Sequence, residues 1–428
     1  MPIDNLYKIF KQHPFIQTDT RQIKKGELFF ALKGPNFNGN LFAAKAIEMD
    51  AAAVIVDEET GIKDPRIIQV DDVLTTLQEL ALHHRKQFNI PFIAITGSNG
   101  KTTTKELANA VLSTTFKTYT TKGNLNNHIG IPLTILSIRE DAEMAVIEMG
   151  ANHQKEIEGY CKIALPTHGI INNCGKAHLE GFGGVEGIRK GKGELYQFLA
   201  ANNGIAFVNS DLDYLLPMCD KINHVEFYGN SAGNNTLKVV EKEPFLALEF
   251  QGMDLGNHLI HTNLVGEYNT ANIDAAITVG LFFGISIDKI KEAIASYQPN
   301  NARSQMIQKG SNKIILDAYN ANPTSMRLAI ENFASMKADI KYLFLGGMME
   351  LGDYSNQEHL EIVHLLESLN LKNVVLVGGD FEKTNHSFPF FKTAMEAGYW
   401  LRENQPNNSL ILIKGSRGIK MESILDFF

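Results

Sequence analysis

The chain has 428 residues, which at about 150 residues per domain corresponds to roughly three domains. It is 44% hydrophobic and 21% charged, as ordinary folded proteins are, and its net charge of −8 disfavours a general nucleic-acid-binding protein, which normally has a basic excess. The three cysteines lack C-x-x-C spacing, so neither a disulfide framework nor a cysteine zinc site is indicated. No apolar run approaches about 18 residues and no secretory signal is visible, so we expect a soluble, cytoplasmic protein without membrane insertion.

The first predicted domain, residues 1–88, alternates short strands with helices. Strands are expected at 28–32, 53–56 and 67–70, and helices at 41–49 and 74–87. This alternation predicts a small α/β domain.

The second predicted domain, residues 89–298, opens with the fully apolar strand 92–95. Further apolar strands are expected at 145–147, 169–171 and 205–208, and a helix at 270–283. Segments 237–240 and 246–250 break this alternation and resemble antiparallel ribbons. The pattern predicts a parallel sheet with helices on its faces and additional antiparallel strands.

The third predicted domain, residues 299–428, again alternates strands with helices. Strands are expected at 314–316, 343–345, 374–377 and 410–413, and helices at 325–336, 358–369 and 392–403. The sequence therefore predicts a second, Rossmann-like, doubly wound α/β unit.

A glycine-rich loop lies between the strand at 92–95 and the next helix, and consists of Gly97, Ser98, Asn99, Gly100, Lys101, Thr102 and Thr103. Backbone N–H groups of such a loop surround phosphate oxygens at the positive end of a helix, while the lysine adds charge and the threonine hydroxyl binds Mg²⁺. Only two residues separate the glycines, whereas the general pattern has four. The alternative is a turn that needs glycine only for its geometry.

Three further groups follow strands whose carboxyl ends should meet this loop. Glu148 closes the strand at 145–147, where it would complete a Mg²⁺ site or be a surface carboxylate. His178 lies a few residues past the strand at 169–171, in a loop where a histidine is usually polar surface. Lys190 and Lys192 lie in a glycine-punctuated segment that, considered alone, is typical of a solvated helix start.

Together these motifs resemble the ATP-dependent Mur ligases of peptidoglycan synthesis, over nearly the whole chain. The shorter glycine spacing at 96–103 is that family's form, and 123–132, 148–151 and 178–194 resemble its next motifs. Segments 317–326, 345–352 and 414–417 are similar to the branch that adds D-alanyl-D-alanine to UDP-N-acetylmuramoyl-tripeptide. One departure is Gly347, which stands where the family often has Asp.

The resemblance implies ATP and two Mg²⁺ ions, with Lys101, His178 and Lys192 as the catalytic residues. Thr102 and Glu148 would bind the Mg²⁺ between the β- and γ-phosphates, and His178 would bind a second Mg²⁺ near the substrate carboxylate. Lys192 aligns with a lysine often carbamylated in the family, with Lys190 as the nearby alternative. The other nucleotide contacts implied are Asn269, Asn272, Arg303, Asp317 and Tyr319.

The resemblance also assigns the substrates to domains. The first domain would bind the UDP-sugar through Thr20, Arg21, Asn36 and Phe37. Asn127 is a further substrate residue, and Arg417 would contact the incoming dipeptide while the third domain closes over ATP. A monomer is expected.

Two alternatives stay open on the sequence alone. One is another ligase of this fold, which adds a different amino acid or a polyglutamate tail. The other is a nucleotide-dependent switch without catalysis, which leaves Glu148, His178 and Lys192 without a shared purpose.

Overall fold

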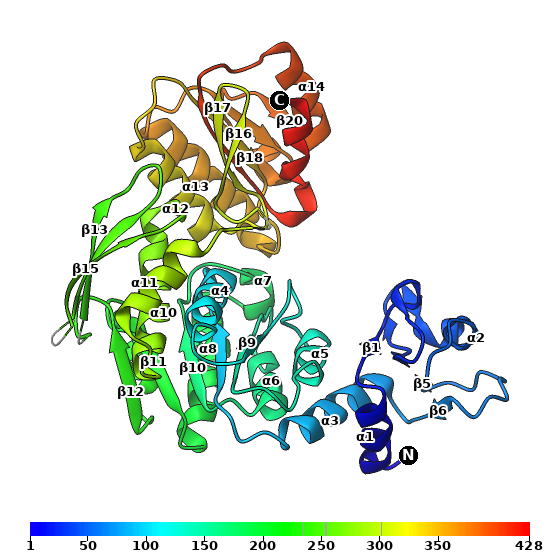
Figure 1. The fold of residues 1–428 in the computed structure, drawn as a ribbon. Helices are drawn as coiled ribbons and strands as arrows, with labels where there is room; N and C mark the ends of the chain where they lie inside the picture. The colour runs from blue at the N-terminus through cyan, green and yellow to red at the C-terminus, as the bar shows by residue number, and fades with distance from the viewer. Residues whose placement is uncertain (234, 253–254, 301) are drawn as a thin grey trace.

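The computed structural model describes residues 1–233, 235–252, 255–300 and 302–428. Figure 1 shows three α/β bodies, with the C-terminal body above the central one and the N-terminal body to the side. Across the described ranges, no helix is both long and apolar enough to cross a bilayer. The predicted α/β class is confirmed, since each body is built on a largely parallel sheet.

The N-terminal body contains a four-stranded parallel sheet in the order β1-β2-β5-β6. These strands are Ile16–Gln17, Leu28–Phe30, Ala53–Val56 and Ile67–Gln69. A small antiparallel pair, β3 (Lys33–Gly34) and β4 (Phe37–Asn38), projects from it. The helices are α1 (Ile3–Gln12), α2 (Ala43–Glu48) and α3 (Val73–Arg85). Helix α3 also packs against the central body, so it connects the two (Figure 1).

The central body has a six-stranded, all-parallel sheet in the order β12-β11-β10-β7-β9-β8. In chain order from β7, the strands are Phe92–Thr96, Thr118–Thr120, Met144–Glu148, His168–Ile171, Ile205–Asn209 and His224–Tyr228. Every residue of β7, β9 and β10 is buried, which explains their continuous apolar runs, because helices cover both faces of a parallel sheet.

Helices flank this central sheet, and an antiparallel sheet extends from it. From α4 to α11 the helices are Lys101–Leu112, Gly130–Leu136, Glu156–Ala164, Leu179–Phe182, Val185–Ala201, Leu216–Cys219, Thr270–Phe282 and Ile287–Ser296. The antiparallel strands β13 (Asn235–Glu241), β14 (Ala247–Gly252) and β15 (Gly256–His261) confirm the predicted ribbons.

The C-terminal body has a six-stranded sheet in the order β16-β17-β21-β18-β19-β20, in which only the β16–β17 pair is antiparallel. The strands are Gln305–Lys309, Asn312–Asp317, Lys341–Gly346, Val374–Val377, Phe390–Phe391 and, for β21, Leu410–Lys414. Helices α12 (Pro323–Ser335), α13 (Ser355–Ser368) and α14 (Ala394–Glu403) connect them. The antiparallel edge strand β16 was not predicted.

The predicted domain boundaries fall between regular elements. Residue 88 lies between α3 and β7, and residue 298 lies between α11 and β16. We retain 1–88, 89–298 and 299–428 as proposed domains.

Candidate active site

The glycine-rich loop connects β7 to α4 as predicted, but the helix begins earlier than expected, at Lys101. The left-handed backbone of Gly100 (φ 80°) turns the chain directly into the helix. Lys101, Thr102 and Thr103 are therefore helical, and only residues 97–100 form the loop. Exposed backbone N–H groups at a helix start favour an anionic ligand.

Lys101 folds back over this loop. Its Nζ donates to the carbonyl oxygens of Gly97 at 2.7 Å and Ser98 at 3.3 Å. Burial lowers the pKa of Lys101, and the charge of Arg303 lowers it further while Glu148 opposes the shift. When a nucleotide binds, the Lys101 ammonium can give up these carbonyl contacts and bind a phosphate oxygen instead.

Buried amide side chains hold the loop from behind. A Cβ on Gly100 would lie 2.3 Å from Asn272 Oδ1 and 2.9 Å from Asn172 Nδ2, so only glycine fits there. Asn172 Nδ2 donates to Thr104 Oγ1 at 2.8 Å, and Thr104 Oγ1 donates to Asn272 Oδ1 at 3.1 Å. Asn272 Nδ2 then donates to Asn269 Oδ1 at 2.9 Å. Asn269 and Asn272 thus tie α10 to α4 and to Asn172 behind the loop. Their contact with a base stays a prediction.

Glu148, at the end of β9, faces the first turn of α4. Its Oε2 accepts a hydrogen bond from Thr102 Oγ1 at 2.9 Å, and its Oε1 accepts one from Asn126 Nδ2 at 2.7 Å. Only 1% of Glu148 is exposed, so the surface-carboxylate alternative is wrong. Asn126 was not predicted, although it lies in the recognised motif at 123–132.

Lys192 lies on α8 and is buried, with 1% exposed, whereas Lys190 is exposed. The idea of a solvated helix start is therefore wrong for Lys192, because the face of α8 that carries Lys192 is buried where the helix packs against the central sheet. Its Nζ donates to the Ala151 carbonyl at 3.3 Å and lies 5.2 Å from the centre of the Phe182 ring. Burial, with a smaller contribution from the Lys101 charge, lowers the pKa of Lys192 to about 7.

His178 immediately precedes α7, and its contact comes from the C-terminal body. Its Nδ1 forms a hydrogen bond with Oε2 of Glu350, which follows β18. This bond is the main cause of the lowered pKa of Glu350. The partnership was not predicted, because 172 positions separate the two residues.

The third-body residues predicted for the nucleotide lie together. Asp317 Oδ2 accepts from Lys414 Nζ at 2.5 Å, while its Oδ1 accepts from the Ser304 N–H at 3.1 Å. The guanidinium carbons of Arg303 and Arg417 lie 3.6 and 5.4 Å from the centre of the Tyr319 ring. The structure thus groups Arg417, predicted to contact a dipeptide, with the predicted nucleotide residues.

The predicted UDP-sugar residues lie in the N-terminal body, which Figure 1 shows to one side of the central sheet. Arg21 follows Thr20 in a short 3-10 helix and pairs with Asp19 at 2.7 Å, which lowers the pKa of that carboxyl to about 2. Asn36 and Phe37 are exposed at the β3–β4 turn.

Asn127 has a local structural role at the start of α5. Its Oδ1 accepts hydrogen bonds from the N–H groups of Ile129 at 3.1 Å and Gly130 at 2.9 Å. Its substrate role, like that of the N-terminal residues, stays a prediction.

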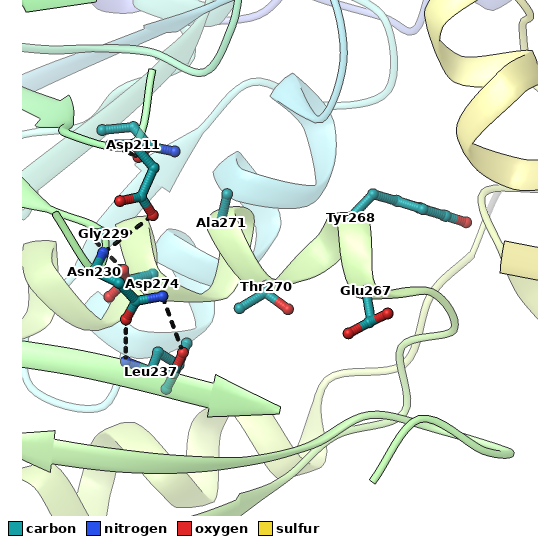
Figure 2. Close-up of a pocket in the computed structure, with 10 residues that line it drawn as sticks. Asp211, Gly229, Asn230, Leu237, Glu267, Tyr268, Thr270, Ala271 and Asp274 are labelled. Atoms are coloured by element: carbon teal, nitrogen blue, oxygen red, sulfur yellow. Dashed lines mark hydrogen bonds between the residues drawn. The ribbon is translucent and has the colours of Figure 1, made fainter. Parts of the chain in front are cut away.

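A separate hollow of about 240 Å³ lies at the start of α10, near the carboxyl ends of β11 and β12 (Figure 2). Within it, the Gly229 N–H donates to Asp274 Oδ2 at 2.9 Å, and burial raises the pKa of Asp274 to about 7. No predicted site residue is among its lining residues, which are Asn209, Asp211, Gly229, Asn230, Leu237, Glu267, Tyr268, Thr270, Ala271 and Asp274.

The departure at Gly347 has a packing explanation. A Cβ there would lie 2.6 Å from Gly379 Cα and 2.9 Å from its nitrogen, so the loops after β18 and β19 meet backbone to backbone. An acidic side chain at this position would need one of the two loops to move.

The fold and the site define a nucleotide-dependent enzyme of the phosphate-loop class. Family models match three successive stretches: the catalytic domain of the Mur ligase family at 13–93, the Mur ligase middle domain at 95–280, and the Mur ligase glutamate ligase domain at 302–417. The chain belongs to the Mur ligase family, and the resemblance found in its sequence is confirmed.

Individual relatives are similar over nearly the whole chain. The chain is 33% identical to the UDP-N-acetylmuramoyl-tripeptide–D-alanyl-D-alanine ligase of Bacillus subtilis (strain 168), across 96% of this chain and 92% of that protein. A crystal structure of MurF from Acinetobacter baumannii has a TM-score of 0.88 at 32% identity, covering 99% and 97% of the two chains. MurF ligase from Thermotoga maritima in complex with ADP has a TM-score of 0.86 at 27% identity, covering 97% of each chain.

Proposed function

We propose that this chain is an ATP-dependent, ADP-forming ligase that joins D-alanyl-D-alanine to UDP-N-acetylmuramoyl-tripeptide in peptidoglycan synthesis. The observation that carries the proposal is the arrangement at one edge of the central sheet, where the Thr102–Glu148 pair adjoins the phosphate loop and the charge of Lys101 acts on buried Lys192. The name of the Bacillus subtilis relative, UDP-N-acetylmuramoyl-tripeptide–D-alanyl-D-alanine ligase, supports these particular substrates.

The chemistry starts from an unreactive carboxylate, because oxide is a poor leaving group. A carboxylate oxygen of the tripeptide attacks the γ-phosphorus of ATP, forming an acyl phosphate and releasing ADP. The amine of D-alanyl-D-alanine then attacks the carbonyl carbon, and the tetrahedral intermediate expels phosphate. Lys101 and the N–H groups of the loop would offset the repulsion between these anions.

The residues around Glu148 suit Mg²⁺. Thr102 and Glu148 would hold one ion and His178 a second, and the bound metal would supply positive charge next to the phosphates. Within the described ranges, no three His, Cys, Asp or Glu side chains gather as a metal cage. This fits Mg²⁺, which usually binds through one or two carboxylates together with substrate phosphates and water.

Lys192 suits carbamylation. A pKa of about 7 leaves much of its amine neutral near physiological pH, and the neutral amine is the form that reacts with CO₂. Among the described residues its ammonium has no ion-pair partner, and burial disfavours the cation. The carbamate would replace this buried cation with an anion able to orient a metal.

The three bodies would divide the substrates. The N-terminal body would take the UDP-sugar, the central body ATP, and the C-terminal body the dipeptide while it closes over ATP. We further propose that the protein acts as a cytoplasmic monomer.

A substrate panel tests the function. Purified protein with ATP and Mg²⁺ is expected to release ADP only when UDP-N-acetylmuramoyl-tripeptide and D-alanyl-D-alanine are both present. Turnover with a single amino acid in place of the dipeptide would favour another ligase of this fold. No carboxylate-dependent ADP formation would favour a nucleotide switch.

A further inference from the structure

The contact between His178 and Glu350 joins two bodies at the proposed metal site. Both residues have left-handed backbones, with φ of 53° and 62°, and each lies in a loop after a parallel strand, β10 or β18. The contact between the two side chains therefore depends on both loops keeping a left-handed backbone at these positions.

Neighbouring contacts join the loop after β10, and the phosphate loop, to the start of α12 and to α13 of the C-terminal body. Lys176 Nζ lies 2.5 Å from Glu358 Oε1, and the Lys176 N–H donates to Thr324 Oγ1 at 3.0 Å. On the phosphate loop, Asn99 Oδ1 accepts from Asn322 Nδ2 at 2.7 Å. Glu350 therefore reaches His178 from a docked surface.

The chemistry of imidazole gives this contact a consequence. A neutral imidazole carries one N–H donor and one lone-pair acceptor, and the partner of one nitrogen decides which is which. A carboxylate on Nδ1 accepts its proton, which leaves the Nε2 lone pair available to a metal. Metal-binding histidines commonly have such a carboxylate behind them.

We propose that Glu350 is a positioning residue for His178: its carboxylate fixes the tautomer and orientation in which Nε2 binds the divalent cation. Because Glu350 comes from the C-terminal body, docking of that body completes the metal site in the central one. This inference rests on the proposed function, which assigns the metal to His178.

The test is Mn²⁺ affinity of the full chain with ADP, measured by the electron paramagnetic resonance signal of free Mn²⁺. His178→Ala is expected to remove one Mn²⁺ site. Glu350→Ala is expected to lower the Mn²⁺ affinity of that same site by about 10- to 100-fold. Glu350→Gln retains an acceptor oxygen for Nδ1–H, so it should stay within about threefold of wild type. In a His178→Ala background, Glu350→Ala should have no further effect.

Glu358→Ala is the matched control, because Glu358 joins the same bodies through Lys176 without touching His178. The Lys176–Thr324 and Asn99–Asn322 hydrogen bonds still join the two bodies in this variant, so its Mn²⁺ affinity should stay within about threefold of wild type. The proposal is overturned if Glu350→Ala binds Mn²⁺ normally, if Glu350→Gln loses as much as Glu350→Ala, or if Glu358→Ala loses as much. The first result would show that Glu350 has no role in metal binding. The second would show that Glu350 binds the metal directly, and the third that any weakening of the contact between the two bodies lowers Mn²⁺ affinity. Because Mn²⁺ binding needs no peptide substrate, failure of the ligase assay is a separate result.

Discussion

The phosphate loop and the Lys192–His178 region lie at the same edge of the central sheet but are stabilised differently. Amides of the central body supply most of the support for the loop, since Asn172 and Asn173 both bond to Asn99, and Asn172 is linked through Thr104 to Asn272. Asn322 of the C-terminal body adds one contact, also to Asn99. Within the part of the chain that the structure describes, Lys192 has one hydrogen bond, to Ala151, whereas His178 is bonded to Glu350 of another body. The loop thus has its binding conformation before phosphate binds. The Lys192–His178 region, by contrast, would need the docked C-terminal body, bound Mg²⁺ and carbamylation of Lys192 to form its metal site.

The largest effect is expected from breaking the preformed loop. In Gly100→Ala, the new methyl would collide with Asn272 and the left-handed backbone would be strained, so ADP formation should fall by about 1,000-fold or more. Calorimetry should show lost ATP binding. Gly123→Ala is the control, since it also has positive φ, at 56°, but nothing lies within 4 Å of its added carbon. Equal ATP binding by both variants would show that the amides do not constrain the loop.

In the Lys192–His178 region, the largest effect is expected from removing the buried amine of Lys192. Lys192→Ala should lower ligase turnover by about 100-fold, because the group proposed to orient the metal is lost. Lys190→Ala removes an exposed lysine of the same helix and should have little effect on turnover. Near-normal turnover of Lys192→Ala would exclude the carbamate role.

A smaller effect is expected at the boundary between the two regions. Asn126→Ala removes the amide that holds Glu148 Oε1, so the Mg²⁺ concentration for half-maximal ADP formation should rise by about 10- to 100-fold. The exposed Asn124 in the same loop gives the control, Asn124→Ala. If the two variants require the same Mg²⁺ concentration, Asn126 does not position Glu148.

The mildest test varies pH. With a pKa of about 7, the neutral fraction of Lys192 at pH 8 is about ten times that at pH 6. CO₂-depleted protein should therefore regain activity about tenfold faster at pH 8 than at pH 6, at a fixed dissolved CO₂ concentration. Recovery is measured as ADP release after transfer to assay pH. A recovery rate independent of pH would argue against carbamylation at this amine.

Local features of the site were predictable from the sequence. The apolar run of β7, the glycines and Lys101 are adjacent in the chain, and physical chemistry alone indicates a phosphate site. Strand β5 has the predicted bounds, 53–56, because an apolar run is sufficient to indicate a buried strand.

Features that depend on distant contacts were not predictable from local sequence. Asn172 and Asn272 are 100 positions apart, and their hydrogen bond needs α10 packed against α4. Lys192 was named only through the family resemblance, because a lysine between glycines gives no sign of burial. Glu350 lies in a recognised motif, yet only the docked third body indicates its partner.

The most direct measurement of the central claim follows oxygen from substrate to product. Tripeptide substrate with both oxygens of the reacting carboxylate labelled with ¹⁸O is turned over with ATP and D-alanyl-D-alanine, and the released phosphate is analysed by mass spectrometry. Transfer of the phosphoryl group to the carboxylate predicts one ¹⁸O in each phosphate. Unlabelled phosphate would contradict the account, because it would mean that water, rather than the substrate carboxylate, accepts the phosphoryl group.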